Sequence, residues 1–131
     1  MLVVRADHRL AGRGSVPLAD LADEQFIDFP VGYGNRGVVD QAFAAAGLER
    51  QVALEVVDIG VGAQFVRHGS GVAFLPEFAA PKGPDLRVLH VSDHVLRWTL
   101  AVATSSTRRP SAAVRALLAL VEEHLRLPTT R

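Results

Sequence analysis

The spacing of apolar residues divides the chain into short strands that alternate with helices. Val39 and Phe43 recur at helical spacing and predict a helix over residues 36–46, which Asn35 would cap and Gly47 would end. Asp58 is placed to cap a second helix over residues 59–68. Runs rich in β-branched and aromatic residues predict strands over residues 2–6, 26–29, 51–57, 72–75, 86–91 and 97–104.

The end of the chain carries the clearest amphipathic pattern. From about residue 110 to residue 125 apolar side chains fall on one helical face, namely Val114, Leu117, Leu118, Val121 and Leu125. Elsewhere, strand and helix alternate from residue 26 to residue 75 with short connections. This order predicts an α/β fold with a parallel sheet covered by helices.

Three glycines lie between the strand at 26–29 and the helix that follows it. Gly32, Gly34 and Gly37 match the pattern G-x-G-x-x-G, in a context where free backbone N–H groups at a helix start can bind a phosphate or carboxylate. Two interpretations compete: a nucleotide-binding turn, or one wall of a small-molecule cleft.

The nucleotide interpretation requires an acidic residue about 20 positions beyond the glycines, and Asp58 meets that requirement. However, Pro30 and Val31 lengthen a turn that a dinucleotide site needs to be tight. A nucleotide-binding α/β module, or an enzyme built on the same loop, therefore remains the alternative hypothesis.

Composition narrows the possible functions. The 131 residues are 49% hydrophobic and 21% charged, which is typical of a folded domain. Fourteen basic and fourteen acidic residues cancel, so this chain alone is not expected to bind DNA. Without cysteine there is no disulfide or thiol nucleophile. No apolar run has the length of a signal peptide core or a membrane helix, and a cytoplasmic location is expected.

Candidate catalytic and metal-binding groups are weak. His90, Asp93 and His94 could be metal ligands, but they lie in a turn between two predicted strands with no other histidine near in sequence. Ser70 lies after a helix and before a strand, which is the reverse of a nucleophile elbow, and the only lysine, Lys82, is in a loop. We therefore expect no enzyme activity, no metal and no cofactor.

The order of several segments resembles the effector-binding domain of LysR-type transcriptional regulators. The resemblance rests on the glycine loop together with residues 8–11, 17–27, 46–48, 52–56 and 69–76. It implies a fold similar to type 2 periplasmic binding proteins, in which two α/β subdomains are joined by two crossing strands and the effector lies between them.

The resemblance also implies a domain organisation. Residues 26–91 would be the complete, Rossmann-like second subdomain, residues 2–6 and 98–103 the hinge strands, and residues 110–126 the C-terminal helix of an incomplete first subdomain. Residues 1–131 would then be a partial effector-binding domain, with the DNA-binding domain absent.

The implied function is control of DNA binding and transcription by a small-molecule effector, often a small carboxylate or another anion. Backbone N–H groups and the Arg36 side chain would hold that anion. The first candidate group is Val31, Gly32, Tyr33, Gly34, Asn35 and Arg36. Asp58, Ile59 and Gly60 form a second candidate group at the next helix start.

The expected partners follow from the same resemblance. A homodimer or higher oligomer is expected, with the C-terminal helix as the candidate contact because its apolar face would otherwise remain exposed. DNA would be contacted only through the missing N-terminal domain, and no membrane contact is expected.

Overall fold

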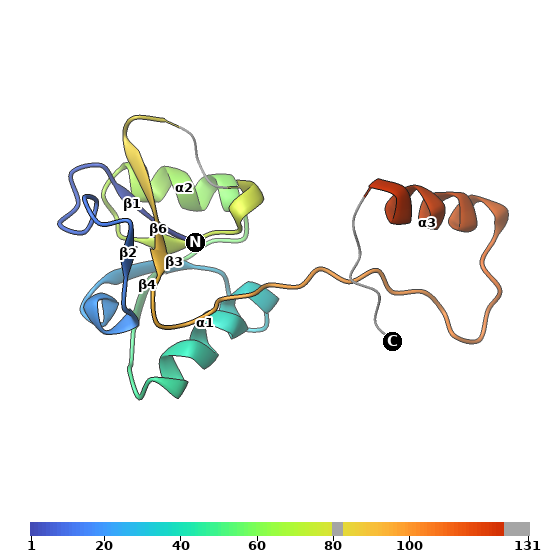
Figure 1. The fold of residues 1–131 in the computed structure, drawn as a ribbon, viewed down its shortest axis with the longest axis horizontal. Coiled ribbons are helices and arrows are strands. Elements are labelled where there is room, and N and C mark those ends of the chain that lie inside the picture. The colour runs from blue at the N-terminus through green and yellow to red at the C-terminus, as the bar shows by residue number, and fades with distance from the viewer. Residues whose placement is uncertain (80–82, 125–131) are drawn as a thin grey trace. The chain divides into compact units, whose positions relative to one another are not determined.

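The computed structural model describes residues 1–79 and 83–124 and consists of two compact units. The first unit runs from Met1 to Trp98 and contains the strands of the described residues and the first two α-helices. The second begins at Thr99 and contains the last helix (Figure 1).

The strands of the first unit form a mixed arrangement. Strand β1 is antiparallel to β5 on one side and to β6 on the other, and β2 runs parallel to β6. The strands are β1 (Leu2–Arg5), β2 (Ser15–Val16), β3 (Gln25–Asp28), β4 (Gln51–Glu55), β5 (Ala73–Phe74) and β6 (Leu86–Val91).

The parallel part predicted from the sequence is present around β3. Strand β3 pairs in parallel with β4, and Phe26 also forms a parallel bridge with Val72, the residue before β5. The N–H groups of Ile27 and Val72 donate across this bridge to the carbonyls of Val72 and Gln25, both at 2.9 Å. Strand β3 therefore joins β4 to the rest of the strands.

Two α-helices of the first unit follow the strands as expected, with one correction at a helix start. Helix α1 (Gly34–Ala45) begins one residue before Asn35, so the predicted cap at Asn35 is wrong. Tyr33 is the last residue with extended backbone and occupies the cap position. Helix α2 (Ile59–Arg67) begins as predicted, because the Asp58 carboxylate accepts the Val61 N–H at 2.9 Å. Short 3-10 turns are η1 (Leu18–Leu21) and η2 (Glu77–Ala79).

Apolar side chains cover both faces of these strands. Along β1, Leu2 and Val4 join the cluster that includes Phe43 of α1, whereas Val3 joins the cluster that includes Val66 of α2. Successive residues of a strand point to opposite faces, so one buried strand supplies both clusters. Figure 1 accordingly shows α1 and α2 on opposite sides of the strands.

The strand predicted over residues 97–104 does not form. The structure has no regular secondary structure there, and the alternating apolar side chains Trp98, Leu100 and Val102 are exposed. A strand needs a neighbour for its backbone N–H and C=O groups, and no described strand pairs with this segment. The apolar residues alternate as in a strand, but the strand prediction is wrong because no described strand pairs with this segment. Whether residues 98–103 act as a hinge stays a prediction, as do the subdomain bounds.

The second unit confirms the last predicted helix, α3 (Ala112–His124). Its first residue lies close to the predicted start at 110, and the predicted end at 125–126 falls outside the described residues. No side chain of α3 is buried, and Val114, Leu117 and Leu120 are exposed. Within the second unit, no described residue buries the apolar face of this helix.

Gly71 is required where β3 meets the segment before β5. Its φ is 149°, and a Cβ atom there would lie 2.3 Å from the carbonyl oxygen of Gln25. We expect Gly71→Ala to lower the free energy of unfolding by about 1–3 kcal/mol, because backbone must move at a hydrogen-bonded bridge. Urea denaturation measures this change.

Gly12→Ala is the matched control, since a Cβ there meets no atom within 4 Å. Equal denaturation midpoints for the two variants would contradict this account of the β3–β5 contact.

Candidate functional site

The sequence-predicted site residues lie where parallel strands end. The segment 29–33 follows β3 and leads into α1, residues 56–58 follow β4 and lead into α2, and residues 75–76 follow β5 and lead into η2. Because β3 is parallel to β4 and to the segment entering β5, these three connections lie at one edge of the strands. In α/β folds, the carboxyl ends of parallel strands are the usual place for a ligand.

The first turn of α1 offers unused hydrogen-bond donors. Tyr33 at the cap position makes no side-chain hydrogen bond to the helix, and the first turn carries no acidic residue. No described residue accepts a hydrogen bond from the N–H groups of Gly34, Asn35 or Arg36. These N–H groups and the helix dipole together favour an anion.

The loop before α1 is open to solvent. Gly32 adopts a φ of 99°, a backbone conformation that favours glycine, and Val31 beside it is 79% exposed. The Tyr33 ring stacks on Phe29, with ring centroids 5.8 Å apart and planes at 22°. The phenol ring is therefore positioned by the end of β3 and still partly exposed.

The start of α2 differs from that of α1. The Asp58 carboxylate already accepts from Val61 and adds negative charge at the helix start. A Cβ on Gly60 would lie 3.1 Å from an Asp58 carboxylate oxygen, and one on Gly62 would lie 3.4 Å from the Val56 side chain. Packing against the chain itself explains both glycines. This second candidate group is less suited to an anion than the first.

The Arg36 side chain faces the protein and contacts carboxylates. Its Nε donates to Asp40 at 2.9 Å, and one terminal nitrogen donates to the Phe29 carbonyl at 2.8 Å and to Glu55 at 3.2 Å. Burial lowers the pKa of this guanidinium, but Asp40, Asp28 and Glu55 together raise the pKa above its ordinary value. The side chain offered by the sequence as a partner for a ligand is thus already engaged by the protein.

A buried ion pair behind the loop was not identified from the sequence. Asp28, at the end of β3, is 3% exposed, and an Arg50 terminal nitrogen lies 2.5 Å from its carboxylate. Arg50 also donates to Asp40 of α1 at 2.6 Å and lies over the rings of Phe26 and Phe43. The signal that could have revealed it is an aspartate inside the apolar run Phe26–Phe29.

This ion pair fixes α1 against the strands. Asp40 bridges Arg36 and Arg50, so α1 is connected through these arginines to the end of β3 and the segment before β4. The position of the free N–H groups at the start of α1 therefore depends on this group of buried and half-buried charged side chains.

The metal site considered at His90, Asp93 and His94 is not supported. The Asp93 carboxylate accepts the Leu18 N–H at 3.1 Å, and the His94 Nδ1 lies 3.3 Å from it. Among the described residues, no group of three or more histidine, cysteine or acidic side chains could hold a metal ion. Through this hydrogen bond, Asp93 instead connects the residues after β6 to the start of η1.

A further depression lies away from the loop of α1. It has a volume of about 350 Å³ and is near the amino ends of β3 and β4, opposite the edge described above. Asp23 and Glu49 make it unfavourable for an anion. Its lining residues are Ala22, Asp23, Glu49, Arg50 and Gln51.

Comparison with known families decides the class of this domain. The family model described as LysR substrate binding domain matches residues 1–126. The chain belongs to the LysR substrate-binding domain family. This membership confirms the resemblance found in the sequence and places the chain in a class of transcriptional regulators, not enzymes.

Curated relatives of this LysR domain are longer HTH-type regulators. The uncharacterized HTH-type regulator YwbI of Bacillus subtilis is 30% identical over 128 residues, covering 95% of this chain and 42% of the relative. The HTH-type regulator CysB of Burkholderia cenocepacia is 36% identical over 77 residues, covering 59% of this chain and 25% of the relative. The chain thus spans less than half the length of these relatives.

Solved structures confirm the periplasmic-binding-protein-like α/β fold of LysR effector-binding domains. A LysR family regulator of Pseudomonas aeruginosa matches with a TM-score of 0.82 and 23% identity, over 95% of this chain and 44% of that one. The Synechocystis CcmR regulatory domain in complex with 2-PG matches with a TM-score of 0.76 and 22% identity, over 93% of this chain and 60% of that one. The QuiR effector-binding domain with shikimate matches with a TM-score of 0.75 and 21% identity, over 94% of this chain and 61% of that one.

Among the described helices, none combines the length and the apolar character that a membrane span requires.

The buried ion pair leads to a stability prediction. We expect Arg50→Met to lower the free energy of unfolding by about 3–5 kcal/mol, because the buried Asp28 carboxylate loses its cation. The double variant Asp28→Asn/Arg50→Met removes both charges, and we expect it to recover part of this loss. Chemical denaturation measures all three proteins.

Arg13→Met is the matched control, because Arg13 pairs with Asp20 at the surface and is 56% exposed. We expect this control to change stability by less than about 1 kcal/mol. A loss for Arg50→Met no larger than that for Arg13→Met would contradict the role assigned to the buried pair.

Proposed function

We propose that this chain is the effector-sensing part of a LysR-type transcriptional regulator and that it binds a small carboxylate or related anion. The observation that carries the proposal is the uncapped first turn of α1, at the carboxyl ends of parallel strands. Family membership supports the binding of a small molecule. The CcmR and QuiR domains were solved with 2-PG and shikimate, and the similar BenM effector-binding domain was solved with its effector benzoate.

Backbone groups, not a side-chain cation, hold the anion in this proposal. The N–H groups of Gly34, Asn35 and Arg36 point out of the helix start, and the Arg36 guanidinium secures α1 to Asp28, Asp40 and Glu55. Val31, Gly32 and Tyr33 form the adjoining wall. Asp58, Ile59 and Gly60 border the site from α2, where the Asp58 carboxylate that caps the helix would orient a hydroxyl or amine of the effector and not its anionic group.

The site would act through the larger regulator. An effector held between this edge and a second subdomain would favour one relative angle of the two subdomains, because it contacts both only in that arrangement. DNA would be bound through a separate N-terminal domain, and the regulator would work in the cytoplasm without a cofactor.

The nucleotide alternative has little support from the geometry. Its acidic residue, Asp58, is occupied as the cap of α2, and its binding turn is lengthened by Pro30 and Val31. Thermal shift with AMP and ATP beside benzoate, shikimate and malate compares the two hypotheses on the same protein. Stabilisation by the nucleotides alone would overturn the effector proposal.

A proline at the start of α1 tests the backbone anion site. Gly34→Pro removes one free N–H, and the extended backbone of Tyr33 before it suits a proline at this position. We expect the affinity for whichever carboxylate binds to fall about tenfold or more, since one hydrogen bond to a charged group is lost. Isothermal titration calorimetry measures the affinity.

Gly34→Ala is the control, because it adds the same Cβ next to Trp98 but keeps the N–H. We expect it to bind the carboxylate more tightly than Gly34→Pro. Equal affinities for the two variants would argue against anion binding by the backbone of this turn.

We further propose that the exposed face of α3 forms a homo-oligomer contact. Leu117 is 60% exposed and Leu120 is 53% exposed, and burial of each leucine would contribute about 1.5–3 kcal/mol. We expect Leu117→Gln/Leu120→Gln to shift the mass measured by light scattering from an oligomer to a monomer. The control is Glu122→Gln/Glu123→Gln on the same helix, and a monomeric parent chain would refute this contact.

A further inference from the structure

The edge that holds the free N–H groups also gathers exposed apolar side chains. Val31 follows β3, Val57 follows β4 and Phe78 lies in η2 after β5, and they are 79%, 71% and 72% exposed. Single exposed apolar residues are normal on a protein surface, but three from successive connections at one edge indicate a binding surface. None of these three side chains belongs to the buried core.

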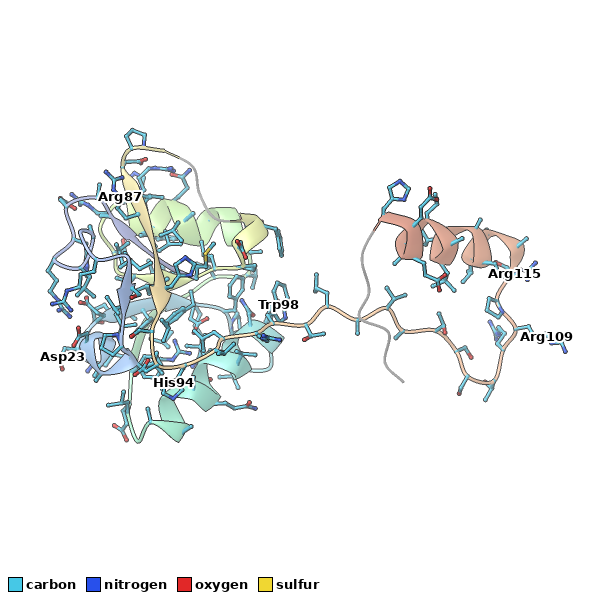
Figure 2. The ribbon with its side chains drawn as sticks, in the orientation of Figure 1. Asp23, Arg87, His94, Trp98, Arg109 and Arg115 are labelled. Carbon is cyan, nitrogen blue, oxygen red and sulfur yellow. The ribbon has the colours of Figure 1, made fainter. Side chains whose placement is uncertain are left out.

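Trp98 connects this apolar edge to the start of α1. A Cβ atom on Gly34 would lie 3.2 Å from the Trp98 Nε1, so the indole nitrogen is beside the first free N–H of the helix. Figure 2 shows the Trp98 side chain at α1, where the chain leaves the first unit. A Cβ atom at residue 34 would require the indole to move by only a few tenths of an ångström.

Phe78 gives Trp98 an aromatic neighbour from a distant part of the sequence. The two rings have centroids 6.2 Å apart and planes at 27°, and the indole remains 38% exposed. Aromatic pairs of this geometry hold each ring in place while leaving a face or an edge available. An exposed aromatic pair beside several unused N–H groups suits a ligand that is anionic at one end and planar at the other.

We infer that Trp98 and Phe78 are specificity-determining residues of the effector site and that they select a small carboxylate carrying a planar ring. This inference rests on the proposed function of the α1 turn. The carboxylate contacts the N–H groups of α1 and accepts a further hydrogen bond from the Trp98 Nε1–H, because an indole nitrogen can only donate. The ring of the effector packs against Trp98 and Phe78 and shields them from water.

Intrinsic fluorescence provides a direct test, because Trp98 is the only tryptophan of the chain. Benzoate and acetate are the probes, since they share the carboxylate and differ in the ring. We expect benzoate to bind the parent chain at least about tenfold more tightly than acetate and to shift the Trp98 emission. Calorimetry measures both affinities independently of the fluorescence.

Two substitutions separate the roles of the ring and of its N–H. Trp98→Phe keeps an aromatic ring but removes the donor, and we expect it to weaken benzoate and acetate by a similar factor. Phe78→Leu keeps the donor but removes an aromatic neighbour, and we expect it to reduce the preference for benzoate. Val95→Ala is the control, because Val95 is an exposed apolar residue of the segment that leads to Trp98 and has no role in the proposed site.

The outcomes distinguish this inference from the proposed function. If benzoate binds and Gly34→Pro weakens it, but Trp98→Phe and Phe78→Leu bind as the parent does, the effector site stands and the aromatic selection is refuted. Equal affinities of the parent for benzoate and acetate refute the selection as well. If neither these probes nor the other carboxylates bind, the proposed function fails and the inference fails with it.

Discussion

The carboxylate of Asp28 is buried at the end of β3, and the arrangement around α1 depends on how its charge is compensated. Arg50 provides the cation and also contacts Asp40, which in turn holds Arg36. Removing a buried charge from water is costly unless partners are well placed, so these groups must stay together. One consequence is local: the first turn of α1 is held at the strand ends without any side chain capping it.

The exposed apolar residues of this domain have a common physical cause. Trp98, Leu100 and Val102 alternate as in a strand, and Leu117 and Leu120 lie on one helical face, yet none is buried. Hydrophobic residues gain stability only when another apolar surface removes them from water. Within its own unit, no described neighbour buries any of these side chains, and the chain spans 42% of the length of one of its LysR relatives. We therefore expect a partner chain or a ligand to contact these residues.

Two helix starts at corresponding positions of the fold differ in their chemistry. Both α1 and α2 follow a parallel strand, but Asp58 caps α2 and places a negative charge there, whereas α1 has neither a cap nor an acidic first turn. Charge at a helix start decides whether its N–H groups are available to an anion. The difference favours α1 as the anion site even though the arginine in its first turn is engaged elsewhere.

The sequence by itself determined the helices, most strands and the glycine loop, because these depend on local periodicity, Asp58 as a cap and glycines at 32, 47 and 69. The sequence also indicated the family, because several short segments occur in the order that is typical of a LysR domain, and the family model confirms it. Tertiary structure alone decided the rest. Asp28 pairs with Arg50 across 22 positions of sequence, Trp98 reaches Gly34, and residues 97–104 lack a strand partner. Such contacts depend on which distant segments meet, and local patterns of hydrophobicity do not specify that.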